Sequence, residues 1–218
     1  MPFTGFTSEA GEFLWELAFH NEKPWFEAHR EQFLRAVKEP FDALAKETLA
    51  LMQNKHPDEP YCLHISRIYR DARRLFGRGP YKDHLWFTLW TGEDRHNSPV
   101  FWFELSPASY SYGVGFYTAT AEQMAALRRY IDANPAEMER LAKRVAKSEF
   151  HLEGEPYKRL KKDVGEVLNP WYNRKWISLC AEYDHGGALY TSELPGVLFD
   201  AFEKLMPVYK LLKRFPAE

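Results

Sequence analysis

The spacing of hydrophobic residues changes along the chain and predicts helices, then strands, then mainly helices again. From Phe6 to Gln53, apolar residues recur every three or four positions, the spacing of amphipathic helices. From Leu63 to Tyr117, they occur at alternate positions or in short continuous runs, which is typical of strands. Helical spacing returns at Ala121. A group of strands between groups of helices indicates an α+β fold.

Three amphipathic helices are predicted at the start of the chain. The first covers Phe6–Leu17, and the second begins at Pro24, a residue suited to a first helical turn. The third is expected from Phe41 to Gln53. Asn21 precedes the second helix, so we expect it to order the entry into that helix.

The strand region favours an antiparallel sheet. Leu85–Trp90 is apolar on both faces and is therefore expected to be a central strand. The connections between the early strands are short, which favours an antiparallel meander. The predicted strands are Leu63–Tyr69, His84–Thr91, Pro99–Leu105, Ser109–Tyr117, Phe150–Glu153 and Lys175–Tyr183.

The second half of the chain adds central and C-terminal helices. We predict helices at Ala121–Asn134 and Pro135–Lys147. The first helix should end at Asn134, because a proline disfavours the helical conformation in the residue before it. A closing helix starts near Ser192 and is expected to be interrupted or kinked at Pro207. Because no linker or repeat is present, residues 1–218 are predicted to form a single α+β domain. Its mainly antiparallel sheet, of roughly five to six strands, would be packed by N-terminal, central and C-terminal helices.

The composition is that of an ordinary globular protein and narrows the choice of partners. Hydrophobic residues make up 45% of the chain, charged residues 28%, and the net charge is -2. A nearly neutral chain lacks the field that drives general binding to nucleic acid, so such a role would need a local basic patch. There is no basic leader and no apolar run of about 20 residues, so we expect a cytoplasmic protein without membrane contact.

The cysteines and histidines show no pattern of a metal or redox site. Cys62 and Cys180 fall in predicted strands far apart in the sequence and are expected to be buried thiols, not a disulfide. The eight histidines are dispersed, without the spacing of metal ligands. We therefore predict no metal and no cofactor.

The stretch from Arg67 to Lys82 is the most distinctive part of the chain. It holds six basic residues and one acidic residue, Asp71, so its net charge is +5. Arginine side chains match phosphate or carboxylate oxygens two at a time, and the turn at Gly77–Pro80 can expose backbone N–H groups. These features predict an anion site. The alternative is a solvated hairpin loop in which Asp71 pairs with a neighbouring arginine. The basic residues are Arg67, Arg70, Arg73, Arg74, Arg78 and Lys82.

Arg67 and Glu104 are predicted to occupy apolar surroundings. Strand alternation places Arg67 on the same face as the apolar Ile65, where a charge needs a partner. Glu104, inside an apolar run, is the first candidate partner, and Glu182 is the second. A structural Arg67–Glu104 pair is the favoured interpretation. Alternatively, both residues line a cleft in which Glu104 or Asp71 acts as a general base.

A second basic segment, Tyr157–Lys162, follows later in the chain. If it folds beside the first, the cations and aromatic rings of Tyr81 and Tyr157 would suit a nucleotide or a short single strand. The alternative is that it forms a solvated surface.

Taken together, these segments resemble the bacterial and fungal family known as domain of unknown function 2461. The most specific match is Arg70-Asp71-x-Arg73 running into Pro80-Tyr81-Lys82. The resemblance implies an α+β domain and implies no particular activity, substrate or catalytic residue. Further matching segments are Phe13-Leu14, Asn21 with Trp25-Phe26, Gly113-x-Gly115-Phe-Tyr117, Leu127-Arg128 and Lys158-Arg159.

The leading hypothesis is a binder of a phosphate- or carboxylate-bearing small molecule, with enzymatic activity left open. One alternative is a non-enzymatic module that binds nucleic acid or a protein partner through both basic stretches. The other is that the arginines are purely structural and the function lies elsewhere. The candidate ligand-binding residues are Arg67, Arg70, Arg73, Tyr81, Lys82, Tyr157 and Lys158, and the candidate catalytic residues are Asp71 and Glu104.

Overall fold

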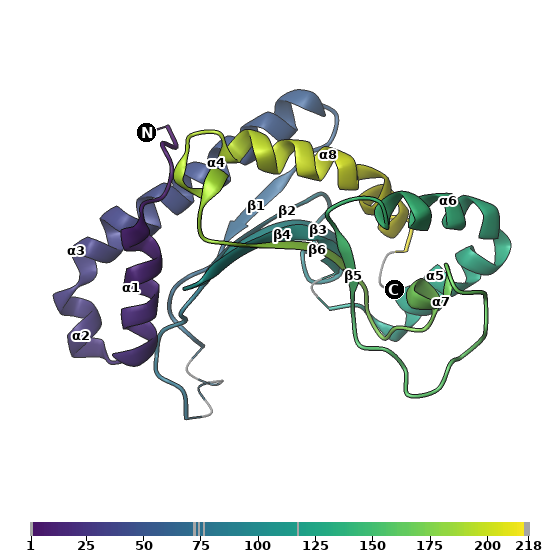
Figure 1. The fold of residues 1–218 in the computed structure, drawn as a ribbon, viewed down its shortest axis with the longest axis horizontal. Helices are drawn as coiled ribbons and strands as arrows, with labels where there is room; N and C mark the ends of the chain where they lie inside the picture. Colours follow the sequence, from purple (N-terminus) through teal and green to yellow (C-terminus); the bar gives the residue numbers. More distant parts are fainter. Residues whose placement is uncertain (1, 72, 74, 76, 117, 216–218) are drawn as a thin grey trace. The chain divides into compact units, whose positions relative to one another are not determined.

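The computed structural model describes residues 2–71, 73, 75, 77–116 and 118–215. Within them, six strands form an antiparallel sheet in the order β1-β2-β3-β4-β6-β5 (Figure 1). This arrangement confirms the α+β prediction and the meander from β1 to β4. The strands are β1 (Cys62–Ile65), β2 (Leu85–Trp90), β3 (Pro99–Leu105), β4 (Ser109–Phe116), β5 (His151–Glu153) and β6 (Ser178–Asp184). The helices are α1 (Ser8–Phe19), α2 (Lys23–Ala28), α3 (Arg30–Phe33), the π-helical η1 (Leu34–Lys38), α4 (Glu39–Lys55), α5 (Ala121–Ala133), α6 (Pro135–Val145), α7 (Asn169–Tyr172), the 3-10 helix η3 (Gly187–Tyr190) and α8 (Leu194–Leu212).

The chain divides into two compact units. The first unit contains residues 1–89, 102–111 and 182–200, and the second contains residues 90–101, 112–181 and 201–218. Strands β2, β3, β4 and β6 and helix α8 each contribute residues to both units. The single domain over residues 1–218 stays a prediction.

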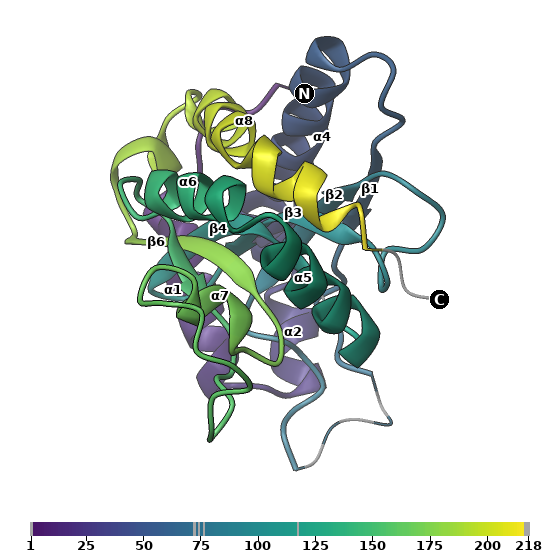
Figure 2. The same cartoon turned by 90° about the vertical axis from the view of Figure 1, so that its right-hand side faces the viewer.

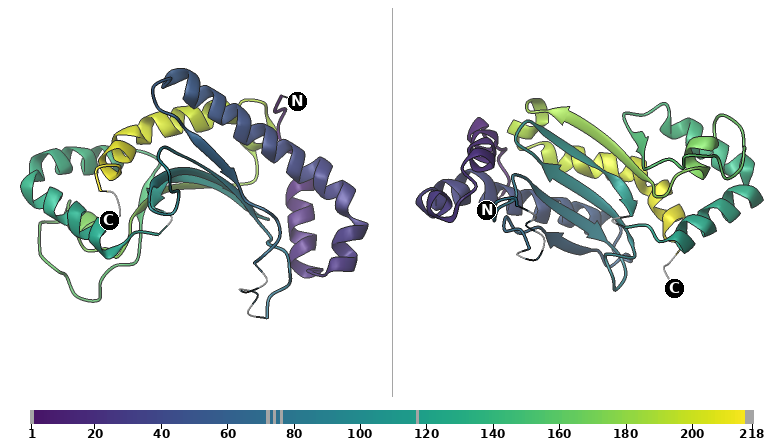
Figure 3. Two further views of the ribbon diagram at one scale, coloured as in Figure 1. Left: turned by 180° about the vertical axis from the view of Figure 1, so that it is seen from behind. Right: turned by 90° about the horizontal axis from the view of Figure 1, so that it is seen from below.

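Aromatic packing builds the core of the first unit. Phe41 of α4 contacts Phe87 of β2 and Phe103 of β3, with ring centroids 5.9 Å away in each case. Helix α4 therefore covers the sheet face that carries these two phenylalanines, and Figure 3 shows α4 running across that face. In the helical layer, Phe13 of α1 packs on Phe26 and Phe33, at 6.5 and 5.6 Å.

The second and third predicted helices join into one almost continuous helical path. After α2, the chain runs from Arg30 through η1 into α4 without a loop. Pro40 lies in the first turn of α4 and has no N–H to donate to the preceding turn. Within η1, the N–H of Glu39 instead bonds to the carbonyl of Leu34, five residues back. A π-helical turn, η1, therefore connects the second predicted helix to the third, which was predicted to start at Phe41.

The second unit packs α5, α6 and part of α8 around its portion of the sheet. Phe101 of β3 stacks on Phe202 and Tyr209 of α8, at 4.8 and 4.5 Å. A capping box formed by Thr120 and Gln123 starts α5, as its sequence favours. Figure 2 shows α6 beside the end of α8. Helix α8 continues through Pro207 to Leu212, so it is not interrupted there, and the alternative of a kink at Pro207 stays a prediction.

Two expectations about the first strand are corrected. Strand β1 ends at Ile65 instead of Tyr69, and Cys62 is exposed, because β1 is an edge strand of the sheet. Cys180 is buried as predicted, and both thiols are free. Among the described residues, no helix is both long enough and apolar enough to span a bilayer.

One polar side chain fixes the loop that follows β1. Asn21, between α1 and α2, accepts a hydrogen bond from the Tyr81 N–H at 2.9 Å and donates its amide to the Tyr81 carbonyl at 3.0 Å. A Cβ atom at Gly79 would collide with Asn21, so only glycine lets the two backbones approach this closely. The role expected for Asn21 at the entry to the second helix is replaced by this long-range contact, because no side-chain hydrogen bond caps α2.

Replacing Asn21 with Ala should destabilise the protein by about 1–3 kcal/mol. The substitution leaves the Tyr81 N–H without its acceptor, whereas the Tyr81 carbonyl keeps a second donor, Arg70. Urea denaturation measures the effect. Asn54→Ala, at an exposed position near the end of α4, is the matched control and should change stability by no more than about 0.5 kcal/mol. Equal stability of the two variants would contradict the role given to Asn21.

Candidate functional site

The basic stretch from Arg67 to Lys82 forms a hairpin-like loop in the first unit. Tyr69 and Tyr81 form an antiparallel bridge. The N–H of Arg70 donates to the Pro80 carbonyl at 2.8 Å, and the N–H of Lys82 donates to the Ile68 carbonyl at 2.7 Å. The two arms of the loop are therefore paired near its base.

The tip of the loop has the structure of the alternative to an anion site, a solvated loop in which Asp71 pairs with a neighbouring arginine. Arg73 donates to both carboxylate oxygens of Asp71, at 3.0 and 2.8 Å, and its side chain is 87% exposed. This bidentate contact confirms the pairing of Asp71 with a neighbouring arginine. Arg78 is also exposed, and Arg74 lies outside the described residues. Asp71 and Arg73 therefore neutralise each other in solvent.

Arg70 is held by the backbone of the loop. Its Nε donates to the Tyr81 carbonyl at 2.6 Å, and its Nη2 lies 3.7 Å from the Asp83 carboxylate. Only 16% of the side chain is exposed. Burial opposes ionisation of Asp83, but its contacts with His84 and Arg70 prevail and lower the pKa of that carboxyl. Arg70 thus has a structural role and also adds positive charge beside Lys82.

The ring of Tyr81 lies in the core. It is 2% exposed and stacks on Phe26 with centroids 4.2 Å apart. Burial, followed by the nearby Tyr69 and Glu27, raises the pKa of Tyr81. The Tyr81 ring is therefore a packing group, and its backbone is the part that holds the loop.

The predicted burial and ion pairing of Arg67 are wrong. Because β1 ends at Ile65, the strand alternation does not extend to Arg67, which is exposed. Within the part of the chain that the structure describes, Arg67 has no carboxylate within 4.0 Å. Glu104 is half-buried and accepts a hydrogen bond from Ser106 at 3.4 Å, whereas Glu182 accepts one from Ser109 at 2.8 Å.

Lys82 is the electrostatic centre of this region. It is half-buried, and its Nζ lies 5.6 Å from the centroid of the Trp86 ring. Burial is the largest cause that lowers the pKa of Lys82 to about 8, Arg70 and Arg67 also lower it, and Glu104 opposes them. We call Arg67, Arg70, Lys82 and Glu104 the Lys82 cluster. Three cations and one carboxylate interact there.

Two tryptophans lie on the sheet face that carries the acidic member of the cluster. Phe87 and Phe103 point toward α4, so their neighbours Trp86, Trp102 and Glu104 project from the opposite face. All three are half-buried. The Lys82 cluster is therefore accompanied by half-exposed aromatic rings, which offer planar surface to a ligand.

The second basic segment belongs to the second unit. Lys161 lies 4.5 Å from the centroid of the Tyr157 ring, and Lys162 donates to Asp132 at 2.6 Å. Lys158 is exposed. The two basic stretches thus belong to different units, and their convergence stays a prediction.

One group of side chains in the second unit offers metal-ligand atoms. His151 lies directly across from Cys180 in the β5–β6 pair, and Glu153 lies two residues along β5. Among the described residues, these donors form a group whose ligand atoms lie within 4.8 Å of one another. His151 and Glu153 are an ion pair at 3.7 Å when the histidine is protonated. The absence of a metal and of a cofactor stays a prediction.

A comparison with known families identifies the chain. The profile of the DUF2461 family, described as a conserved hypothetical protein, matches residues 9–210. The chain belongs to the DUF2461 family. This DUF2461 protein matches no curated protein.

The structure separates the family-like residues of this DUF2461 protein into two roles. Asn21, Arg70 and Tyr81 position the loop through the contacts of the Tyr81 backbone. Lys82 follows directly and carries the perturbed charge. Sequence reasoning missed the tryptophans beside the cluster. The strand alternation around Trp86 and Trp102 was a signal that could have found them.

The lowered pKa of Lys82 predicts a pH-dependent stability. Between pH 8 and pH 10.5 Lys82 binds more protons in the unfolded chain than in the folded chain, so its contribution to folding stability should rise over this range. At pH 7, Lys82→Met should stabilise the protein by about 1–2 kcal/mol, a value reduced for solvent screening of a half-exposed charge. This gain should vanish near pH 10.5 and above.

Urea denaturation at a series of pH values measures this difference. Lys46→Met, at an exposed position of α4, is the control and should show no such pH dependence. A difference between Lys82→Met and the natural protein that stays constant with pH would contradict the lowered pKa.

Proposed function

We propose that this DUF2461 protein binds a small molecule bearing a phosphate or carboxylate group at the Lys82 cluster. The observation that carries the proposal is that Arg67 and Arg70 both act electrostatically on the half-buried Lys82, with Glu104 and Asp83 as nearby carboxylates. Like charges in such a place destabilise the folded state, and a bound anion would remove this cost.

The two arginines suit different contacts. Arg70 is anchored through its Nε at the Tyr81 carbonyl, so its guanidinium is already oriented and loses little freedom on binding. Arg67 is exposed and can reach an oxygen from the solvent side. Lys82 would supply the central point charge. Trp86 and Trp102 would contact the uncharged part of the ligand.

Glu104 is the residue of the cluster suited to proton transfer. Its carboxylate is half-buried and electrostatically coupled to Lys82. Asp71, the other candidate, is committed to Arg73 in solvent. If the bound molecule reacts, Glu104 would act as the general base, and the neighbouring cations would stabilise the negative charge that develops.

The nucleic-acid alternative has less support. Such binding relies on many unpaired cations, because affinity comes from phosphate contacts. Here Arg73 is paired with Asp71, and Lys162 is paired with Asp132. One cation of each basic stretch is therefore already paired with a carboxylate.

Anion binding should raise the melting temperature of the natural protein. The probes are inorganic phosphate, pyrophosphate, AMP and citrate, each over a concentration series. A ligand present at about 100 times its dissociation constant stabilises the folded state by about 2.7 kcal/mol. For a chain of this length, that corresponds to a shift of about 5–10 °C.

A matched pair of double variants locates the binding site. Arg67→Ala/Lys82→Met removes two cations of the cluster and should abolish the shift. Arg73→Ala/Arg78→Ala removes two cations from the same loop and should keep it. If no probe stabilises the natural protein, or both double variants respond like it, anion binding at the Lys82 cluster is excluded.

Proton uptake provides a second readout. A bound anion should raise the pKa of Lys82 from about 8, so binding at pH 8 should take up part of a proton. Calorimetry in two buffers with different ionisation enthalpies measures this uptake. Binding without proton uptake would place the anion away from Lys82.

A further inference from the structure

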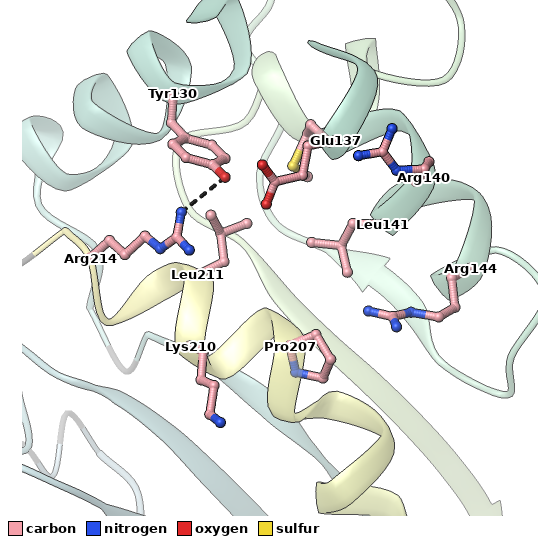
Figure 4. A pocket seen from close by; sticks show the side chains of 10 residues that line it. Tyr130, Glu137, Arg140, Leu141, Arg144, Pro207, Lys210, Leu211 and Arg214 are labelled. Atoms are coloured by element: carbon pink, nitrogen blue, oxygen red, sulfur yellow. Dashed lines mark hydrogen bonds between the residues drawn. The ribbon is translucent and has the colours of Figure 1, made fainter. Parts of the chain in front are cut away.

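The second unit contains a groove that the sequence did not indicate. It lies between α6 and the last turns of α8, with Tyr130 of α5 at one end (Figure 4). Its volume is about 420 Å³, within the range of small-molecule sites. Four apolar residues contribute to its lining: Met138, Leu141, Pro207 and Leu211. The groove therefore offers apolar surface to a ligand.

Four cations surround this apolar surface. Arg140 and Arg144 are one turn apart on α6, and Lys210 and Arg214 have the same spacing at the end of the chain. In Figure 4, Arg144 extends from α6 toward Pro207, and Arg214 extends toward Tyr130. Among the described residues that line the groove, the acidic one is Glu137.

Part of this charge is satisfied by the protein itself. Arg214 donates to the Tyr130 hydroxyl at 3.0 Å, and its guanidinium lies 5.3 Å from the centre of that ring. Burial is the largest cause that raises the pKa of Tyr130, followed by the nearby Glu137 carboxylate. Arg214 therefore already has a partner within the protein, the side chain of Tyr130.

The remaining three cations are uncompensated. Among the residues that the structure describes, no carboxylate lies within 4.0 Å of Arg140, Arg144 or Lys210. Elsewhere in this unit, surface lysines do have partners: Lys143 of α6 pairs with Glu139 at 2.9 Å. The unpaired positive charge of α6 therefore lies along the groove.

We propose that this groove binds a phosphate monoester with an apolar body. The phosphate would meet Arg140 and Arg144, whose guanidinium groups match its oxygens two at a time. The apolar body would cover Leu141, Pro207 and Leu211. This site is separate from the Lys82 cluster, which belongs to the first unit, so each can be disabled by its own substitutions.

Octyl phosphate, kept below its micellar concentration, is the direct probe. Titration calorimetry should show binding to the full chain. Arg140→Ala/Arg144→Ala should weaken this binding by about tenfold or more, because two charge-assisted contacts are lost. Both positions are exposed, and a thermal melt checks that the variant is folded.

Lys143→Ala/Lys147→Ala is the charge-matched control. It removes two exposed cations from α6 and the residues just after it, away from the groove lining. It should change the affinity by less than about twofold. Equal weakening in both double variants would overturn the proposal, because it would indicate general charge attraction. An absence of octyl phosphate binding would also overturn it.

Two further titrations separate the sources of the phosphate. Inorganic phosphate should bind more weakly than octyl phosphate, and equal affinity would contradict the apolar half of the site. Vesicles containing phosphatidic acid test a membrane surface. Binding to the vesicles without binding to octyl phosphate would overturn the proposal of a ligand site in the groove. It would indicate an electrostatic contact with the membrane surface.

Discussion

The pairing of Asn21 with the backbone of Tyr81 is the interaction on which the rest of the candidate site depends. The carboxamide supplies both a donor and an acceptor, as a neighbouring strand would. It holds the end of the basic loop against the helical layer, and Gly79 permits the approach. Successive side chains of an extended segment point in opposite directions. The contact that buries Tyr81 therefore turns Lys82 to the other side, over Trp86.

The charged side chains of the basic loop have different surroundings at its tip and near its base. At the tip, Arg73 and Asp71 are two residues apart and pair locally in solvent, at little cost or gain in stability. Near the base, Arg70 is constrained by the Tyr81 carbonyl, and Lys82 is partly withdrawn from water. Among the described residues, Asp83 lies beside Arg70 and Glu104 acts on Lys82, so the three cations near the base are only partly offset. Charge that folding leaves uncompensated is a feature of ligand sites.

The residues that mark the DUF2461 family in this chain are not one set of ligand contacts. Asn21 and Arg70 hold the backbone of Tyr81 in place, and this backbone positions the next residue, Lys82. The second unit places a different set of cations around an apolar groove, outside the segments that carry the resemblance. A motif thus mixes positions that build a surface with positions that act on it.

The sequence by itself determined most of the local structure and the place where positive charge is concentrated. Strand β3 has the predicted bounds, because an apolar run between turn residues has few alternatives. The pairing of Asp71 with a nearby arginine was also within reach, since the two residues are close in the chain.

Only the tertiary structure decided which charges are buried, paired or left over. Alternation placed Arg67 on a buried face, but the edge strand ends before this residue, and Arg67 is exposed. Asn21 bonds to Tyr81, which is 60 residues away in the sequence. The groove is lined by residues of α6 and of the end of α8, which are also far apart in the sequence. Periodicity along a chain reports which residues share a face. It does not report what packs against that face, and burial and neighbouring charge depend on that packing.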